Sequence, residues 1–117
     1  MSAQDTRAKI AAAANAVVGM NVQPFYWQSS RPGDGMVRWD QQVRSDNRFG
    51  FMDQWQVLVV LPQDAGQSER YADEHRAALI EAVGQELVVT RSTSTSLVLD
   101  NGTPIGVLLI EGSRSAD

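Results

Sequence analysis

The chain has no cysteine and a single histidine, His75, among its 117 residues. Without cysteine, disulfide bonds, thiolate nucleophiles and cysteine-held zinc are all excluded. A hydrolase triad would have only His75 to use, and no second histidine stands at a metal-binding spacing from it. His75 falls among the alanines and leucine of an apolar helical arc, so we expect a packed, neutral side chain with one hydrogen bond rather than a catalytic one. The sequence thus offers no candidate catalytic residue, metal ligand or cofactor site.

Basic residues are fewer than acidic ones, 10 against 14, which gives a net charge of −4. A protein that reads nucleic-acid sequence usually carries a basic patch, whereas the arginines here are scattered along the chain. Long apolar runs are also missing, because a stretch such as residues 57–61 is far too short to span a bilayer. Residues 1–7 lack the basic-then-apolar order of a signal peptide. We therefore expect a protein made in the cytosol, with no membrane partner.

The length is that of one domain, and a hydrophobic fraction of 43% is typical of a globular chain. Ser2 is placed to begin a helix whose apolar face includes Ile10, Ala14, Val17 and Val18, with Gly19 at its end. The remaining periodicities predict a second helix over residues 68–83 and five strands, at 36–43, 54–61, 86–91, 95–99 and 105–111.

The end of the chain carries a strong hairpin signal, because the Asn-Gly pair at residues 101–102 readily supplies positive φ. Residues 112–117 are polar, and we expect them to form a mobile tail. The order of the elements predicts a single α+β domain over residues 1–117. We expect an antiparallel or mixed β-sheet with two α-helices packed on one face and a C-terminal β-hairpin.

Three tryptophans, Trp27, Trp39 and Trp55, fall on extended segments. Core packing and cross-strand aromatic pairing would account for all three. Tryptophan is also enriched at protein interfaces, so Trp27 and Trp39 are candidates for a contact with another subunit. The tryptophan pattern alone leaves both interpretations open.

Two further features are candidates for a subunit or partner interface. The loop at residues 29–35 contains Arg31 and Asp34, and its length fits either a flexible hairpin loop or a loop that docks a partner and becomes ordered on binding. Ile80 projects nearly opposite the centre of the apolar arc of the second helix, which predicts an exposed side chain. It would then be either a lone exposed isoleucine or a contact between subunits.

Three segments together resemble a known family. They are WQVLVVLPQDA at residues 55–65, ADEHRAALIEAVGQEL at 72–87 and DNGTPIGVLLIEGSR at 100–114. This order of strand, helix and closing hairpin is similar to that of the tail terminator proteins of long-tailed bacteriophages, especially those of actinobacterial hosts. The resemblance covers nearly the whole chain and rests on residue type and order rather than on a catalytic signature.

The resemblance implies a virion structural protein, assembled in the host cytoplasm, that forms a homohexameric ring on the finished tail tube. Such a ring stops polymerisation of the tail tube protein and presents a surface to the head–tail connector. DNA would pass through the ring without sequence-specific binding, which suits the low basic content. Another neck or head-completion adaptor stays open as an alternative. A small ligand-binding α+β domain or enzyme would need a concave pocket with convergent polar groups, for which the sequence shows no candidate.

Overall fold

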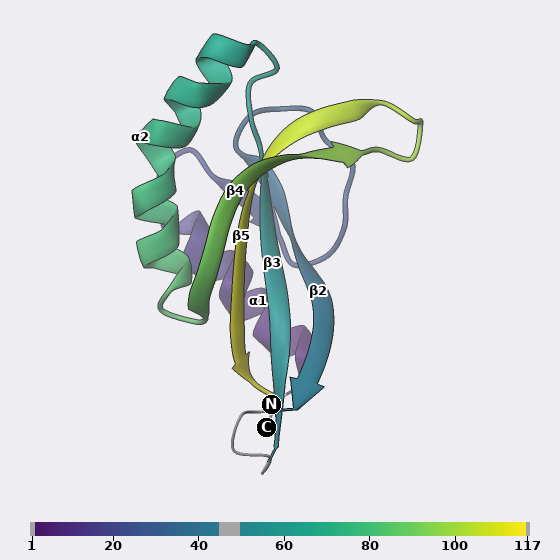
Figure 1. Cartoon of the computed structure of the whole chain (residues 1–117), viewed down its shortest axis with the longest axis vertical. Coiled ribbons are helices and arrows are strands. Elements are labelled where there is room, and N and C mark those ends of the chain that lie inside the picture. The colour runs from purple at the N-terminus through teal and green to yellow at the C-terminus, as the bar shows by residue number, and fades with distance from the viewer. Residues whose placement is uncertain (1, 45–49, 117) are drawn as a thin grey trace.

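The computed structural model describes residues 2–44 and 50–116. It has an α+β fold with a five-stranded mixed sheet and two helices, as the sequence predicts. The elements are α1 (Ala3–Asn15), β1 (Asn21–Gln23), β2 (Asp34–Arg44), β3 (Phe51–Val60), α2 (Ala65–Val83), β4 (Val88–Val98) and β5 (Pro104–Ser115). The strand order is β1-β2-β3-β5-β4, with β1 parallel to β2 and every other pair antiparallel (Figure 1).

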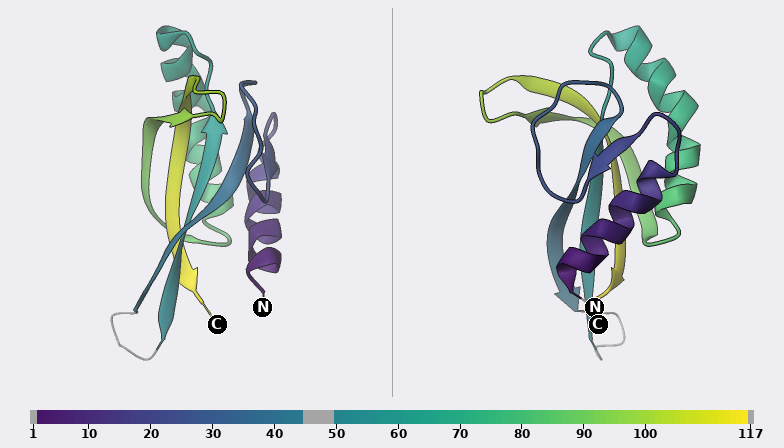
Figure 2. Two further views of the ribbon diagram at one scale, coloured as in Figure 1. Left: turned by 90° about the vertical axis from the view of Figure 1, so that its right-hand side faces the viewer. Right: turned by 180° about the vertical axis from the view of Figure 1, so that it is seen from behind.

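Both helices pack on the same face of the sheet, and the main core lies between these two layers (Figure 2). Burial of the apolar arc of α2 confirms the helical periodicity read from the sequence, since Leu79 and Val83 are fully buried. The main core is made of Ile10, Ala11, Ala14, Val22, Val37, Trp55, Val57, Val59, Leu61, Ala72, Leu79, Val83, Leu87, Leu108 and Ile110.

A second, smaller core lies on the opposite face of the sheet, because alternate residues of β3 point to opposite sides. Its buried members are Met36, Leu58, Val60, Leu99, Ile105, Val107 and Leu109. Trp27 and Leu97 pack against them, from the segment after β1 and from the β4–β5 hairpin. The hairpin turn is tied to that segment, since Tyr26 Oη donates to Asp100 Oδ1 at 3.3 Å and the Asp100 N–H donates to Gln28 Oε1 at 3.2 Å.

The first helix begins as predicted but ends earlier. Ser2 Oγ accepts from the Asp5 N–H at 3.1 Å, so Ser2 is the N-cap. The helix ends at Asn15, whose side-chain amide donates to the Val22 carbonyl at 3.0 Å and accepts from the Val22 N–H at 2.6 Å. These two bonds hold β1, which the sequence did not predict, beside the end of α1. Val18, expected on the buried face, is 91% exposed because it lies beyond the helix end.

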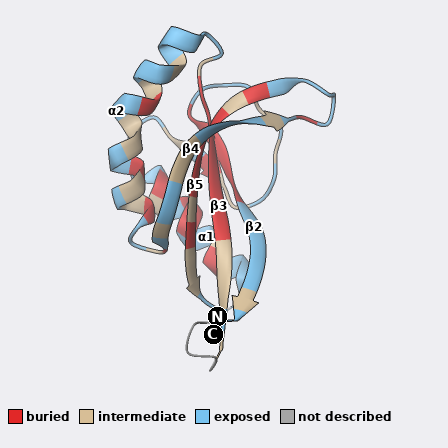
Figure 3. Ribbon diagram, viewed as in Figure 1, coloured by how far each residue is buried: buried red, intermediate tan, exposed pale blue. Residues whose placement is uncertain are grey.

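Two predictions about the terminal strands are wrong. The segments at 86–91 and 95–99 form one continuous strand, β4, with a register shift between Val89 and Arg91. Residues 112–115 are the end of β5 rather than a mobile tail, because they pair with β3, as in Gln54 with Ser113. Of the predicted polar connection at 44–49, residues 45–49 lie outside the described residues. Figure 3 shows buried residues concentrated in the upper and middle sheet and in the inner faces of the helices.

We expect Leu79→Ala to lower the free energy of unfolding by about 3 kcal/mol, because it removes a fully buried side chain and leaves a cavity in the main core. Urea denaturation followed by circular dichroism would measure this change. Val18→Ala is the control and should change stability by less than about 0.5 kcal/mol, since Val18 is exposed. Equal effects of the two variants would contradict the assignment of Leu79 to the core.

Candidate interaction surface

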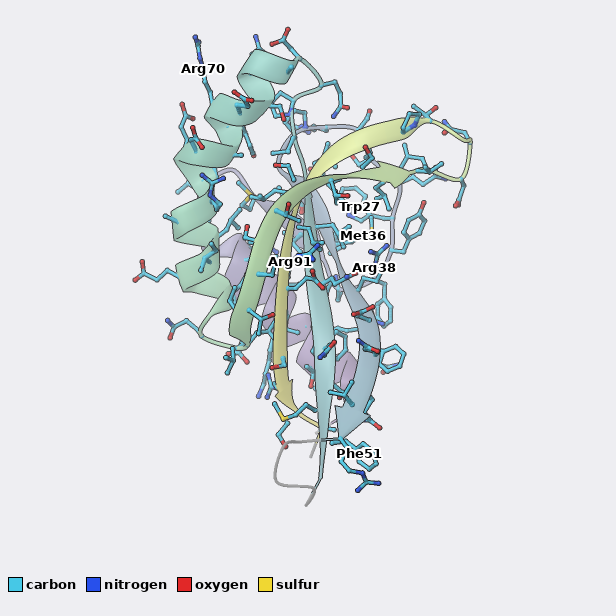
Figure 4. All side chains as sticks on the ribbon, viewed as in Figure 1. Trp27, Met36, Arg38, Phe51, Arg70 and Arg91 are labelled. Atoms are coloured by element: carbon cyan, nitrogen blue, oxygen red, sulfur yellow. The ribbon has the colours of Figure 1, made fainter. Side chains whose placement is uncertain are left out.

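The two candidate tryptophans, Trp27 and Trp39, lie in different environments. Trp27 is half-buried against the second core, and its indole N–H donates to the Gly35 carbonyl. Figure 4 shows Trp27 beside Met36, a member of that core. Trp39 is 45% exposed on β2 and pairs in register with Trp55, which is buried. Trp27 therefore has a packing role inside the subunit, whereas Trp39 offers an exposed indole.

Arg31 lies in the loop before β2 and Asp34 is the first residue of that strand, and their environments differ. Asp34 is only 8% exposed, and its Oδ2 accepts from Ser29 Oγ at 2.6 Å. Ser29 Oγ also accepts from the Arg31 N–H at 3.1 Å, and the Gly33 N–H donates to the Val60 carbonyl at 3.0 Å. These bonds hold the loop within a single subunit. The Arg31 side chain is exposed, whereas the buried Asp34 carboxylate, at the start of β2, holds the loop through Ser29.

The expectation that Ile80 is exposed on the outward side of α2 is wrong. Ile80 is half-buried and packs against the main core. The helix contacts both the sheet and α1, so its buried arc is wider than contact with one layer would give. A substitution such as Ile80→Asp would therefore disturb the fold and could not report on an interface alone.

His75 is packed as expected. Its Nδ1 lies 2.9 Å from the Tyr71 carbonyl oxygen, to which the Nδ1–H tautomer donates, and its ring stacks on Tyr71 with centroids 4.1 Å apart. Burial raises the pKa of the Tyr71 hydroxyl, and the nearby Asp34 carboxylate raises it further. No second acid or base is hydrogen-bonded to the imidazole among the contacts of the described residues.

Three exposed aromatic rings lie near Arg7 or Arg44. We name this the aromatic surface; its exposed rings are Phe25, Trp39 and Phe51. Trp39, on β2, and Phe51, on β3, point to the helix-bearing face, because their register places them on the same side as Trp55. Between them lies Asp53, whose Oδ1 accepts from Trp39 Nε1 at 3.2 Å and from Gln42 Nε2 at 3.0 Å.

Two arginines stack on the rings of this surface. The Arg7 guanidinium carbon lies 4.6 Å from the centroid of Phe25 and 5.2 Å from that of Trp55. Arg44 lies 4.9 Å from the centroid of Phe51. Such cation–π contacts fix the orientation of both partners. Phe51 is at the lower end of the sheet in Figure 4.

Arg7 also links α1 to the sheet. Its Nη1 donates to the carbonyls of Pro24 and Val37, each at 3.1 Å. Burial lowers the pKa of the Arg7 guanidinium, which reflects its partial desolvation. A hollow of about 420 Å³ lies beside it, lined by Ala3, Arg7, Trp39, Gln42, Asp53 and Trp55. The surface therefore combines aromatic rings, planar cations and one carboxylate around a shallow depression.

The opposite face of the sheet carries a row of polar side chains across four strands. Arg38 Nε donates to Gln56 Oε1 at 2.7 Å, and Gln56 Nε2 donates to Glu111 Oε2 at 3.4 Å. Glu111 Oε1 then forms an ion pair with Arg91 Nε at 3.0 Å. Arg38 and Arg91 are both seen on the near side of the sheet in Figure 4. The sequence did not reveal this row, because it depends on the register of four strands.

Within residues 2–44 and 50–116, no group of three or more histidine, aspartate or glutamate side chains is arranged to hold a metal ion. None of the helices in the same ranges is long and apolar enough to cross a membrane. No protein-family model matches the chain, and no curated protein matches it in sequence.

We expect Arg7→Ala to lower the free energy of unfolding by roughly 2–3 kcal/mol, since it leaves two part-buried carbonyls without their charged donor. Arg7→Lys keeps the charge but loses the planar arrangement of donors, so its free energy of unfolding should lie between those of the wild type and Arg7→Ala. Thermal and urea unfolding would measure both. Equal stability of the wild type and Arg7→Ala would show that Arg7 does not hold α1 to the sheet.

Proposed function

We propose that this chain is a virion structural protein, a phage tail terminator that forms a ring on the tail tube and joins it to the head connector. The observation that carries the proposal is the aromatic surface, where Trp39 is left 45% exposed and lines a shallow hollow together with Arg7. Tryptophan, tyrosine and arginine are the residues most enriched in interface hot spots. A surface of this composition is suited to burial against another protein.

The segments that resemble tail terminators form the centre of the fold, which gives the resemblance a structural context. Residues 55–65 form most of β3 and the turn into α2, residues 72–87 most of α2, and residues 100–114 the hairpin turn and β5. The six-fold ring, the tail tube protein and the connector as partners come from the resemblance. A net charge of −4 further supports a channel through which DNA slides without forming the phosphate contacts that drive binding.

Negative-stain microscopy and light scattering of the purified chain, alone and mixed with tail tubes, test the proposal. We expect rings with a central hole and one ring at a tube end. A chain that remains monomeric even on tail tubes would overturn the tail terminator assignment. Rings that bind connector complexes but not tube ends would instead indicate a neck adaptor.

Trp39→Asp should reduce the ring fraction, because it places a charge in a contact that loses water on assembly. The subunit itself should remain folded, since Trp39 is already half exposed. Val18→Asp is the matched control, because Val18 is an exposed apolar residue outside the aromatic surface. Sedimentation velocity measures assembly and circular dichroism measures folding. Loss of rings with the control variant but not with Trp39→Asp would contradict the role of the aromatic surface.

A further inference from the structure

Two long stretches of strand edge carry no partner strand among the described residues. β1 pairs only with Asp34–Met36, and the Val37 carbonyl accepts from Arg7, so residues 38–44 of β2 have β3 on one side and no strand on the other. A register shift between Trp39 and Gln41 interrupts this open stretch. At the opposite end of the sheet, β4 pairs with β5 alone over its 11 residues. Figure 1 shows β2 and β4 on the two sides of the β3–β5 pair. Such edges present rows of backbone N–H and C=O groups to any strand that can reach them.

The two edges run in opposite directions. β2 is antiparallel to β3, β3 to β5 and β5 to β4, so β4 is antiparallel to β2. If a second copy continued the sheet in the same sense, its β4 would lie antiparallel beside β2 of the first. Antiparallel pairing gives hydrogen bonds perpendicular to the strands and is slightly more stable per residue than parallel pairing.

The β4 edge has few of the features that normally prevent edge-to-edge pairing. Its sequence, VVTRSTSTSLV, contains no proline and no lysine. Its only charge is on Arg91, which already forms an ion pair with Glu111. The register shift lies near the start of the strand, so residues 91–98 pair with β5 without interruption. A regular stretch of eight edge residues is therefore open.

Side chains along the two edges are complementary in size. The middle of β4 is made of serine and threonine, whereas the open part of β2 carries large side chains, among them Trp39 and Arg44. Short side chains on one strand leave room for the large ones of the other across the joint.

We propose that β4 of one copy pairs antiparallel with the open part of β2 in the next copy, so that the sheet continues from subunit to subunit. The inference rests on the proposed ring and names its joint. Each subunit offers two different edges, and a head-to-tail contact of this kind closes into a ring when the rotation allows it. Pairing of β4 with β4 would stop at two copies and leave Trp39 exposed. Antiparallel pairing of β2 with β2, centred on the open stretch, would place Arg38 opposite Arg44 of the other copy.

Proline substitution tests the β4 side of the joint, because proline removes a backbone N–H. In an edge strand, the backbone N–H groups of neighbouring residues point alternately toward the paired strand and toward the open edge. Of the variants Ser94→Pro and Thr95→Pro, one therefore breaks the pairing with β5, and the other removes an N–H only from the open edge. The variant that keeps the wild-type circular dichroism and melting temperature is the informative one. It should raise the dissociation constant of assembly about 10-fold or more, because the proline removes one inter-subunit hydrogen bond and leaves the facing carbonyl without a donor.

Of Gln41→Pro and Gln42→Pro, the variant that keeps the wild-type circular dichroism and melting temperature is likewise blocked only on the open edge of β2. Head-to-tail pairing predicts that each blocked variant alone is monomeric in sedimentation velocity. An equimolar mixture should form a dimer and nothing larger, because one intact joint remains between the two variants. Ala12→Ser on the exposed side of α1 is a control that should assemble like the wild type.

The possible outcomes distinguish the proposed strand pairing from the proposed ring. Wild-type rings that persist in the folded edge variants would overturn the edge joint and leave the tail terminator proposal standing. A β2-edge variant that still dimerises by itself would indicate β4–β4 pairing and overturn the head-to-tail arrangement. Wild-type open filaments that both edge variants abolish would support the joint and contradict the closed ring. A wild type that is monomeric at all concentrations and on tail tubes would overturn both.

Discussion

Burial of β3 on both faces is the constraint on which the rest of the fold depends. Residues 57–60 are a continuous apolar run, so the side chains of Val57 and Val59 enter the main core while those of Leu58 and Val60 enter the second. A strand of this kind must be covered from both sides. The two helices supply one cover. The segment after β1 and the β4–β5 hairpin supply the other, which explains why Asp100 in the hairpin turn is hydrogen-bonded to Tyr26 and Gln28.

Cover on both faces is confined to the upper half of the sheet, because β3 changes character along its length. Its first residues, Phe51–Gln54, are exposed or half-buried, whereas Trp55–Val60 are buried. The β3 sequence thus divides the sheet into a packed half that stabilises the subunit and an open half that carries the aromatic surface. Arg7 lies near this boundary, where its guanidinium bonds to two backbone carbonyls and stacks on Phe25 and Trp55.

Local signals made part of this fold predictable. The apolar run of β3, the 3.6-residue period of α2 and the Asn-Gly turn each depend on neighbours in sequence, and each is confirmed. The errors all involve contacts between distant segments. β1 exists because Asn15 binds the Val22 backbone, and residues 112–115 are a strand because β3 extends far enough to pair with them. Ile80 is half-buried because α2 packs on two layers.

The three tryptophans show why residue type could suggest an interface but not locate it. Trp27, Trp39 and Trp55 looked equivalent in sequence, yet one closes the second core, one is half exposed and one is buried. Which environment each occupies depends on strand register and on how far α1 reaches over the sheet, and neither is encoded locally. The open edges of β2 and β4 are likewise visible only in the topology, since a strand shows whether it has two neighbours only once the sheet is formed. Because the aromatic surface and the open stretch of β2 share Trp39, covering that edge would also bury part of the aromatic surface, so the two features are compatible with a single contact between subunits.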